Sequence, residues 1–208
     1  MKRHSDGRLF YMVRNPYHII LASNSPRRKE LLAGLDLQFE VRVLEDIDES
    51  YPNDLPTQKI AEFISKKKAD AYVQTIADDE LVITADTVVI LGDEVMGKPH
   101  GEADAKRMLG ELSGRTHQVT TGVTLSTRER QMSFAVVTNV TFKQLSSDEI
   151  DYYVRTYHPI DKAGAYGIQE WIGYIGVTAL EGSYFNVMGL PVQRIYEALK
   201  TFCETLSK

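Results

Sequence analysis

The segment "LASNSPRRKELL", residues 21–32, places two arginines at the start of a predicted helix. A helix N-terminus already carries partial positive charge, so Arg27 and Arg28 are unfavourable there unless an anion lies nearby. Free N–H groups at a capped helix start bind phosphate, and Ser23, Arg27 and Arg28 would add a hydroxyl and two forked donors. A solvated basic turn is the alternative, because the dipole effect is worth only about 0.3–1 kcal/mol.

Asp86 lies in the middle of the apolar run "LVITADTVVIL", residues 81–91, and Thr87 follows it. Burying a lone carboxylate is costly, so Asp86 must meet a metal, a cation or several hydrogen bonds. Exposure at the edge of a strand is the alternative. Because the residues on both sides are apolar, we favour a functional site.

Two lysines become relevant if they approach Asp86. Lys68 falls on the apolar face of a predicted helix, where it either extends its ammonium group to solvent or enters a site. Lys98, in "GKP", is a surface residue by default. If the loop that carries Lys98 folds back over Asp86, both lysines can neutralise a polyphosphate.

The segment "DKAGAYGIQ", residues 161–169, combines small residues with Asp161, Lys162 and Gln169. Small residues permit close approach of a ligand to the backbone. The Gln169 amide offers donors and an acceptor, the pattern needed to read the edge of a nucleobase. A plain glycine-rich loop is the alternative.

Other catalytic patterns are missing from the sequence. It has no G-x-x-x-x-G-K-[ST] loop, no G-x-S-x-G motif and no histidine pair at metal-binding spacing. His100, His117 and His158 are scattered, and the single Cys203 excludes an intramolecular disulfide. Carboxylates combined with lysines and arginines favour metal-assisted attack of water on a phosphate.

Composition describes an ordinary globular protein: 208 residues, 43% hydrophobic and 25% charged. The net charge of −5 argues against broad nucleic-acid binding. No run approaches the roughly 18 apolar residues of a membrane span and no signal peptide is evident, so we expect no membrane association and a cytoplasmic protein. We interpret residues 1–16 as a flexible leader, with Met12 as an alternative start, and residues 17–208 as one domain.

The elements that must position these residues alternate between strands and helices, with one clear hairpin. This order predicts an α/β fold with a mixed sheet. The hydrophobic patterns predict strands at 17–22, 39–43, 81–91, 117–127, 132–143 and 174–180, and helices at 26–34, 57–76, 105–112, 146–157 and 190–202. Residues 161–173 are expected to form a glycine-rich loop.

Five segments in order resemble the Maf family of nucleoside triphosphate pyrophosphatases. They are "LASNSPRRKELL", "ADTVVILGDEVMGKP", "MLGELSGRTHQVTTGV", "DKAGAYGIQ" and "GSYFNVMGLP". The resemblance runs from about Ile19 to Leu199. It implies an elongated two-lobed α/β fold around a central mixed β-sheet, similar to inosine triphosphate pyrophosphatases, and a possible homodimer.

The resemblance also implies an activity: hydrolysis of a nucleotide between its α- and β-phosphates with a divalent metal cation, Mg²⁺ or Mn²⁺. Asp86 would be the general base or would orient the attacking water, and Glu49 and Asp86 would lie at the metal. The triphosphate would be held by Ser23, Arg28, Lys68 and Lys98.

Three positions match the branch of the family that acts on dTTP and UTP, so Arg27, Thr87 and Gln169 would read the pyrimidine. The alternatives are a 7-methyl-GTP pyrophosphatase and a non-catalytic nucleotide-sensing protein involved in cell division. Trp171 departs from the family pattern, and we expect it to alter the wall of the base pocket. We also expect the two arginines to differ, with Arg28 serving the phosphates and Arg27 the choice of base.

Overall fold

Seven strands form one mixed sheet in the computed structural model, which describes residues 16–204. The predicted leader lies, except for Pro16, outside the described residues. Strand β1 pairs in parallel with both β2 and β3, whereas all other pairs of strands are antiparallel. The order is β2-β1-β3-β5-β6-β7, with β4 beside β3. The strands are β1 (His18–Leu21), β2 (Phe39–Val41), β3 (Glu80–Leu91), β4 (Glu94–Met96), β5 (Thr116–Ser126), β6 (Gln131–Phe142) and β7 (Val177–Glu181).

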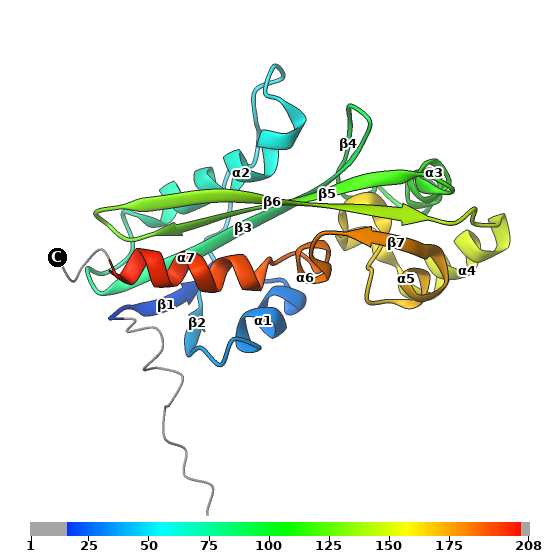
Figure 1. Cartoon of the computed structure of the whole chain (residues 1–208). Coiled ribbons are helices and arrows are strands. Elements are labelled where there is room, and N and C mark those ends of the chain that lie inside the picture. The colour runs from blue at the N-terminus through cyan, green and yellow to red at the C-terminus, as the bar shows by residue number, and fades with distance from the viewer. Residues whose placement is uncertain (1–15, 205–208) are drawn as a thin grey trace, which may run out of the picture.

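The helices are α1 (Pro26–Ala33), α2 (Thr57–Tyr72), α3 (Glu102–Leu112), α4 (Ser147–Tyr157), α5 (Trp171–Gly176), α6 (Tyr184–Met188) and α7 (Val192–Glu204), with short 3₁₀ turns η1 (Pro159–Asp161) and η2 (Ala163–Ala165). In Figure 1, α2 and α7 lie along the long strands on opposite sides, and α3, α4 and α5 gather at one end of the strands. Within residues 16–204, no helix is both long and apolar enough to cross a membrane.

The apolar core is divided along the sheet. One large cluster packs α3, α4 and α5 against one end of the long strands, and another packs α1 and α7 against the other end. In Figure 1, β5 and β6 run along the molecule between these ends. The predicted elongated, two-lobed α/β architecture around a mixed sheet is confirmed.

Strand β3 carries different side chains on its two faces because side chains alternate along a strand. Val82, Val88 and Ile90 pack on the side of α2. Ile83 and Ala85 pack with α1 and α7 on the other side. The same alternation sends neighbouring polar residues of β3 to opposite faces.

The sheet has an opening beside the middle of β3. Pairing with β1 ends at Leu21 opposite Ile83, and pairing with β4 begins at Val89 opposite Met96. Between these positions, residues 84–88 pair with a strand on one side only, β5. Side chains from both faces of β3 can therefore reach the opening.

Helix α2 lies unusually close to the sheet at Gly122 of β5. A Cβ atom at Gly122 would fall 2.2 Å from the backbone of Ala61. Buried hydroxyls hold the next turn of α2: Thr84 Oγ1 donates to the Ser65 carbonyl at 2.6 Å, and the hydroxyls of Ser65 and Thr124 are 3.0 Å apart. This contact sets the height of α2, and of Lys68, above β3.

Most predicted elements are present, including the hairpin of β5 and β6 and the capping box between Ser146 and Glu149 at the start of α4. Three local predictions were wrong. Helix α2 ends at Tyr72 rather than at residue 76, and α6 was not anticipated. Part of the expected glycine-rich loop and the start of the strand expected at 174–180 form α5, because Ile172 is fully buried in the core at this end of the sheet.

Candidate active site

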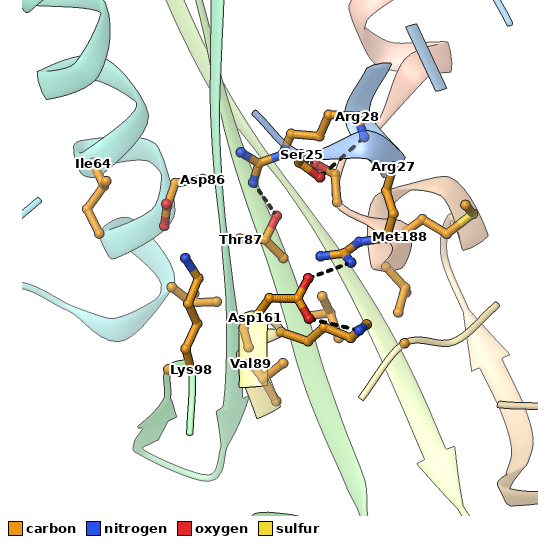
Figure 2. Close-up of a pocket in the computed structure, with 18 of the residues that line it drawn as sticks. Ser25, Arg27, Arg28, Ile64, Asp86, Thr87, Val89, Lys98, Asp161 and Met188 are labelled. Atoms are coloured by element: carbon orange, nitrogen blue, oxygen red, sulfur yellow. Dashed lines mark hydrogen bonds and ion pairs between the residues drawn. The ribbon is translucent and has the colours of Figure 1, made fainter. Parts of the chain in front are cut away.

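A pocket of about 430 Å³ opens at the gap beside β3 (Figure 2). This size is in the ordinary range for small-molecule sites. Its wall contains every predicted site residue except Ser23: Arg27, Arg28, Glu49, Lys68, Asp86, Thr87, Lys98 and Gln169. Residues far apart in the sequence thus meet at the one stretch of β3 that lacks a second neighbouring strand.

Ser23 lies just outside the wall, and Ser25 lines the pocket instead. The buried Ser23 hydroxyl accepts the N–H of Ser25 at 3.2 Å, and the Ser25 hydroxyl caps α1 by accepting the N–H of Arg28 at 3.4 Å. The hydroxyl of Ser23 thus stabilises the turn that leads into α1, and its contact to the triphosphate stays a prediction.

One half of the pocket contains Glu49, Lys68, Asp86 and Lys98, and we call it the carboxylate half. Lys68 Nζ donates to Asp86 Oδ1 at 2.9 Å and forms an ion pair with Glu49 Oε1 at 3.0 Å. The side chains of Lys68 and Asp86 are each 14% exposed. Asp86 thus meets a cation, as expected for a buried carboxylate, and Lys68 enters the site instead of extending to solvent.

Lys98 lies across from Asp86 in Figure 2, on the segment after β4. That segment is tied to η2 by a hydrogen bond from the Gly164 N–H to the Gly97 carbonyl at 3.0 Å. Among residues 16–204, Lys98 has no carboxylate within ion-pair distance. Its exposed ammonium group is therefore available to an anionic ligand.

Arg28 fills the opening in the sheet. Its guanidinium donates to the Ala85 carbonyl at 2.7 Å, to the Gly189 carbonyl at 2.9 Å and to Thr87 Oγ1 at 3.2 Å. Burial lowers the pKa of the guanidinium, and the charge of Asp86 partly opposes this effect. Arg28 stays protonated, but three of its five N–H groups bind the protein, so two remain for a ligand.

The hydrogen bonds of the Thr87 hydroxyl have defined donors and acceptors. Thr121 Oγ1 donates its proton to the Asn186 carbonyl at 3.0 Å, so the 2.9 Å contact between Thr87 and Thr121 has Thr87 as the donor. Thr87 also accepts from Arg28. Because a hydroxyl has one proton, Thr87 can accept a hydrogen bond from a ligand but cannot donate one.

The other half of the pocket contains Arg27, Asp161, Lys162 and Gln169, and we call it the amide half. Gln169 Oε1 is buried and has no hydrogen-bond partner within the described chain. Buried polar atoms are rarely left without a partner, so an unpaired amide oxygen in a pocket wall indicates a ligand with an N–H donor.

Arg27 and Lys162 are both held by Asp161 in this half. Arg27 Nη1 donates to Asp161 Oδ2 at 3.1 Å, and Lys162 Nζ donates to Asp161 Oδ1 at 2.8 Å (Figure 2). Asp161 and Lys162 belong to the segment that the sequence marked as a candidate, but neither was assigned a role in the site. A lysine in a segment of small residues was the available signal, since such a segment is readily buried.

Trp171 does not line the pocket, so the expectation that it alters the wall was wrong. It packs instead against Tyr152 of α4, with ring centroids 4.9 Å apart. The residue lies at the start of α5, which was not predicted, and the helix turns the indole towards α4.

Behind the pocket lies His117, the one buried histidine among residues 16–204. Its Nε2 is 2.7 Å from the hydroxyl of Tyr166, which lines the pocket. Burial lowers the pKa of His117 to about 4, so the imidazole is neutral at physiological pH. It supports the wall and does not supply a catalytic proton.

Comparisons with known proteins identify the family of this chain. Residues 18–202 match the family model described as "Maf-like protein". The chain is 62% identical over 184 residues to a protein of Phocaeicola vulgatus named dTTP/UTP pyrophosphatase, covering 88% of this chain and 95% of the relative. A protein of Parabacteroides distasonis with the same name is 56% identical over 186 residues, covering 89% and 96%.

Among solved structures, the Staphylococcus aureus Ham1 protein is similar with a TM-score of 0.44 and 16% identity, covering 60% of this chain and 71% of that chain. The family model spans nearly all of the residues described here. With relatives this similar over almost their whole length, the chain belongs to the Maf family.

Proposed function

We propose that the protein hydrolyses dTTP and UTP between the α- and β-phosphates, releasing the nucleoside monophosphate and pyrophosphate. The observation that carries the proposal is the division of one pocket into two halves by β3. The carboxylate half offers cations and carboxylates suited to phosphates, and the amide half offers an unpaired amide suited to a base. The names of the relatives support the same activity.

The carboxylate half supplies what the chemistry of the phosphates requires. Hydrolysis at the α-phosphate builds charge on several oxygens, and cations fixed in advance stabilise that charge. Lys68 and Lys98 both line this half, and Arg28 keeps two N–H groups for the ligand. These three residues are the proposed contacts to the triphosphate.

Asp86 is the proposed catalytic carboxylate. It lies in the pocket wall, is mostly buried and is held by Lys68. A carboxylate in this position can orient a water molecule or accept its proton when the water attacks phosphorus. Lys68 has a second effect here, because its hydrogen bond holds the Asp86 carboxylate in a fixed position in the pocket wall.

The residues of the carboxylate half also fit a divalent cation, Mg²⁺ or Mn²⁺. Among the described residues no group of three or more metal-binding side chains exists. Mg²⁺, however, commonly binds one or two carboxylates together with substrate phosphates, and Glu49 and Asp86 provide such a pair around a position already occupied by an ammonium group. The cation would neutralise phosphate charge when bound.

The amide half is the proposed base site, with Arg27, Thr87 and Gln169 as the specificity residues. The ring of uracil or thymine presents two carbonyl acceptors and one N–H donor. The Gln169 amide matches a neighbouring donor and acceptor, and Thr87 can accept but not donate. Arg27 adds donors for a carbonyl.

A nucleotide panel tests the proposal. Purified protein is incubated with dTTP, UTP, CTP, ATP, GTP and 7-methyl-GTP in Mg²⁺, in Mn²⁺ and in chelator, and products are separated by ion exchange. We expect monophosphate and pyrophosphate from dTTP and UTP, and no turnover in chelator. Release of inorganic phosphate alone, a strong preference for 7-methyl-GTP, or tight binding without turnover in either metal would refute the proposal.

A further inference from the structure

Lys162 is a buried lysine held between two carboxylates in the amide half of the pocket. The residue is 8% exposed. Its Nζ lies 2.8 Å from Asp161 Oδ1 and 3.2 Å from Glu170 Oε1. Removing an ammonium group from water is costly, and these two partners compensate the cost.

The ion pairs continue in both directions from Lys162. On one side, Asp161 also accepts a hydrogen bond from Arg27 of α1, a residue 134 positions away in the sequence. On the other side, Glu170 accepts the hydroxyl proton of Tyr153, and that hydroxyl accepts the N–H of Gly167 at 3.0 Å. Lys162 therefore links the arginine of the amide half to the segment that carries Gln169.

The charges of these linked ion pairs cancel one another. Arg27 and Lys162 contribute two positive charges, and Asp161 and Glu170 contribute two negative ones. Burial alone raises the pKa of Asp161, but hydrogen bonds and charges from Lys162 and Arg27 outweigh burial, and the pKa is lowered overall. Asp161 is therefore ionised at neutral pH, and the four linked side chains, Arg27, Asp161, Lys162 and Glu170, carry no net charge together.

We propose that Lys162 determines specificity by balancing, together with Arg27, the two carboxylates Asp161 and Glu170, so that the amide half accepts a neutral pyrimidine and disfavours a cationic base. The inference rests on the proposed function. Uracil and thymine are neutral, whereas the ring of 7-methylguanine carries a positive charge. Carboxylates that are already balanced give that cation nothing to offset its lost hydration, whereas an uncompensated carboxylate would attract it.

A purely structural role for Lys162 predicts something different. If the ion pairs only anchored the loop, their loss would reduce activity on every nucleotide in the same proportion. Restoring electrical neutrality without restoring the ion pair would then have no effect on the choice of base. Variants that change charge in steps can therefore separate the two roles.

The experiment measures kcat/KM for UTP and for 7-methyl-GTP in four forms of the full chain. Relative to the wild type, Lys162→Met gives the amide half one negative charge, Glu170→Gln gives it one positive charge, and the double variant is neutral again. Methionine keeps the length of the lysine stem, and glutamine keeps an acceptor for Tyr153. Thermal unfolding of each variant is recorded alongside.

We expect the ratio of UTP to 7-methyl-GTP activity to follow the charge. It should fall about tenfold or more in Lys162→Met, rise in Glu170→Gln and return to within about threefold of the wild type in the double variant. A ratio that stays constant in all variants, or a double variant no closer to the wild type than Lys162→Met, would overturn the inference. If Lys162→Met does not fold, an unchanged ratio in Glu170→Gln overturns it alone.

The wild type separates this inference from the proposed function. A wild-type protein without activity on dTTP and UTP refutes the proposed function itself. If the wild type prefers UTP but the ratio of UTP to 7-methyl-GTP activity does not change with charge in the variants, only the role of Lys162 is refuted.

Discussion

Asp86 and Thr87 are neighbours in β3, yet their side chains lie on opposite faces of the sheet and contribute to different halves of one pocket. Asp86 contacts Lys68 of α2 at 2.9 Å, whereas Thr87 contacts Arg28 of α1 at 3.2 Å. Both side chains reach the pocket because this part of β3 has a neighbouring strand on one side only. Pairing with β1 has already ended there, and pairing with β4 has not yet begun. One strand can thus align the phosphates of a nucleotide with its base.

Asp86→Asn should reduce turnover of UTP by about 10²–10⁴-fold, since an amide cannot accept the proton of water. Folding should change little because asparagine keeps the shape and Lys68 retains Glu49 as a partner. Asp93→Asn, in the exposed turn between β3 and β4, is the control and should behave like the wild type. Pyrophosphate release and thermal unfolding measure both effects. Retained turnover in Asp86→Asn would remove this residue from the chemistry.

Arg27→Ala and Arg28→Ala should change the activity in different ways. Arg28→Ala leaves the carbonyls of Ala85 and Gly189 without a donor, at about 1–3 kcal/mol for each buried group, and should lose activity on all nucleotides. Arg27→Ala should mainly weaken discrimination between bases. Steady-state kinetics on the nucleotide panel and urea unfolding test the difference. Equal effects across the panel would contradict it.

Gly122→Ala should be strongly destabilising, because the new methyl group meets the backbone of Ala61. Overpacking of this kind costs about 1–3 kcal/mol, and displacement of α2 should also move Lys68 away from Asp86 and lower kcat. Gly110→Ala is the control: it lies on the exposed side of α3 with nothing within 4 Å and should stabilise the protein by roughly 0.5–1 kcal/mol. The free energy of unfolding measures both. A normal stability for Gly122→Ala would show that α2 can shift freely.

Thr84→Val and Thr120→Val remove fully buried hydroxyls with little change of shape, but only one hydroxyl has a partner. Thr84 donates to the Ser65 carbonyl at 2.6 Å, so its loss should cost about 1 kcal/mol or more and reduce turnover through α2. Thr120 Oγ1 has no partner within the described chain, so Thr120→Val should be neutral or stabilising. Thr84→Ser should restore most of the loss. The prediction fails if Thr84→Val and Thr120→Val are equally destabilising.

Stability should fall in acid through His117. Burial lowers its pKa in the folded protein from 6.5 to about 4, so the unfolded chain binds a proton first as pH falls. The loss should begin near pH 6.5, grow to roughly 2–3 kcal/mol near pH 4, and level off below it. His117→Phe removes this contribution, so the difference in unfolding free energy between wild type and variant should change with pH only in that window. A constant difference would contradict the neutral, buried state.

Several features of this protein can be inferred from local sequence. The hairpin of β5 and β6, the capped start of α4 and the buried strand around Asp86 depend on alternation and capping within short segments. Such patterns act over a few residues, so they are readable without the fold. The start of α5 was missed because burial of Ile172 by residues elsewhere in the chain decides it.

The sequence by itself determined most of the order of the elements, apart from α5 and α6, and the types of residue that line the pocket. The tertiary structure alone decided that Arg28 closes the gap in the sheet, that Ser25 lines the wall instead of Ser23, and that Lys162 joins Asp161 to Glu170. These contacts depend on where β1 stops and β4 begins, and on segments such as α1 and η1 that meet across 134 positions. Local patterns constrain the conformation of each segment, but the distances between charged atoms are set only when the segments pack together.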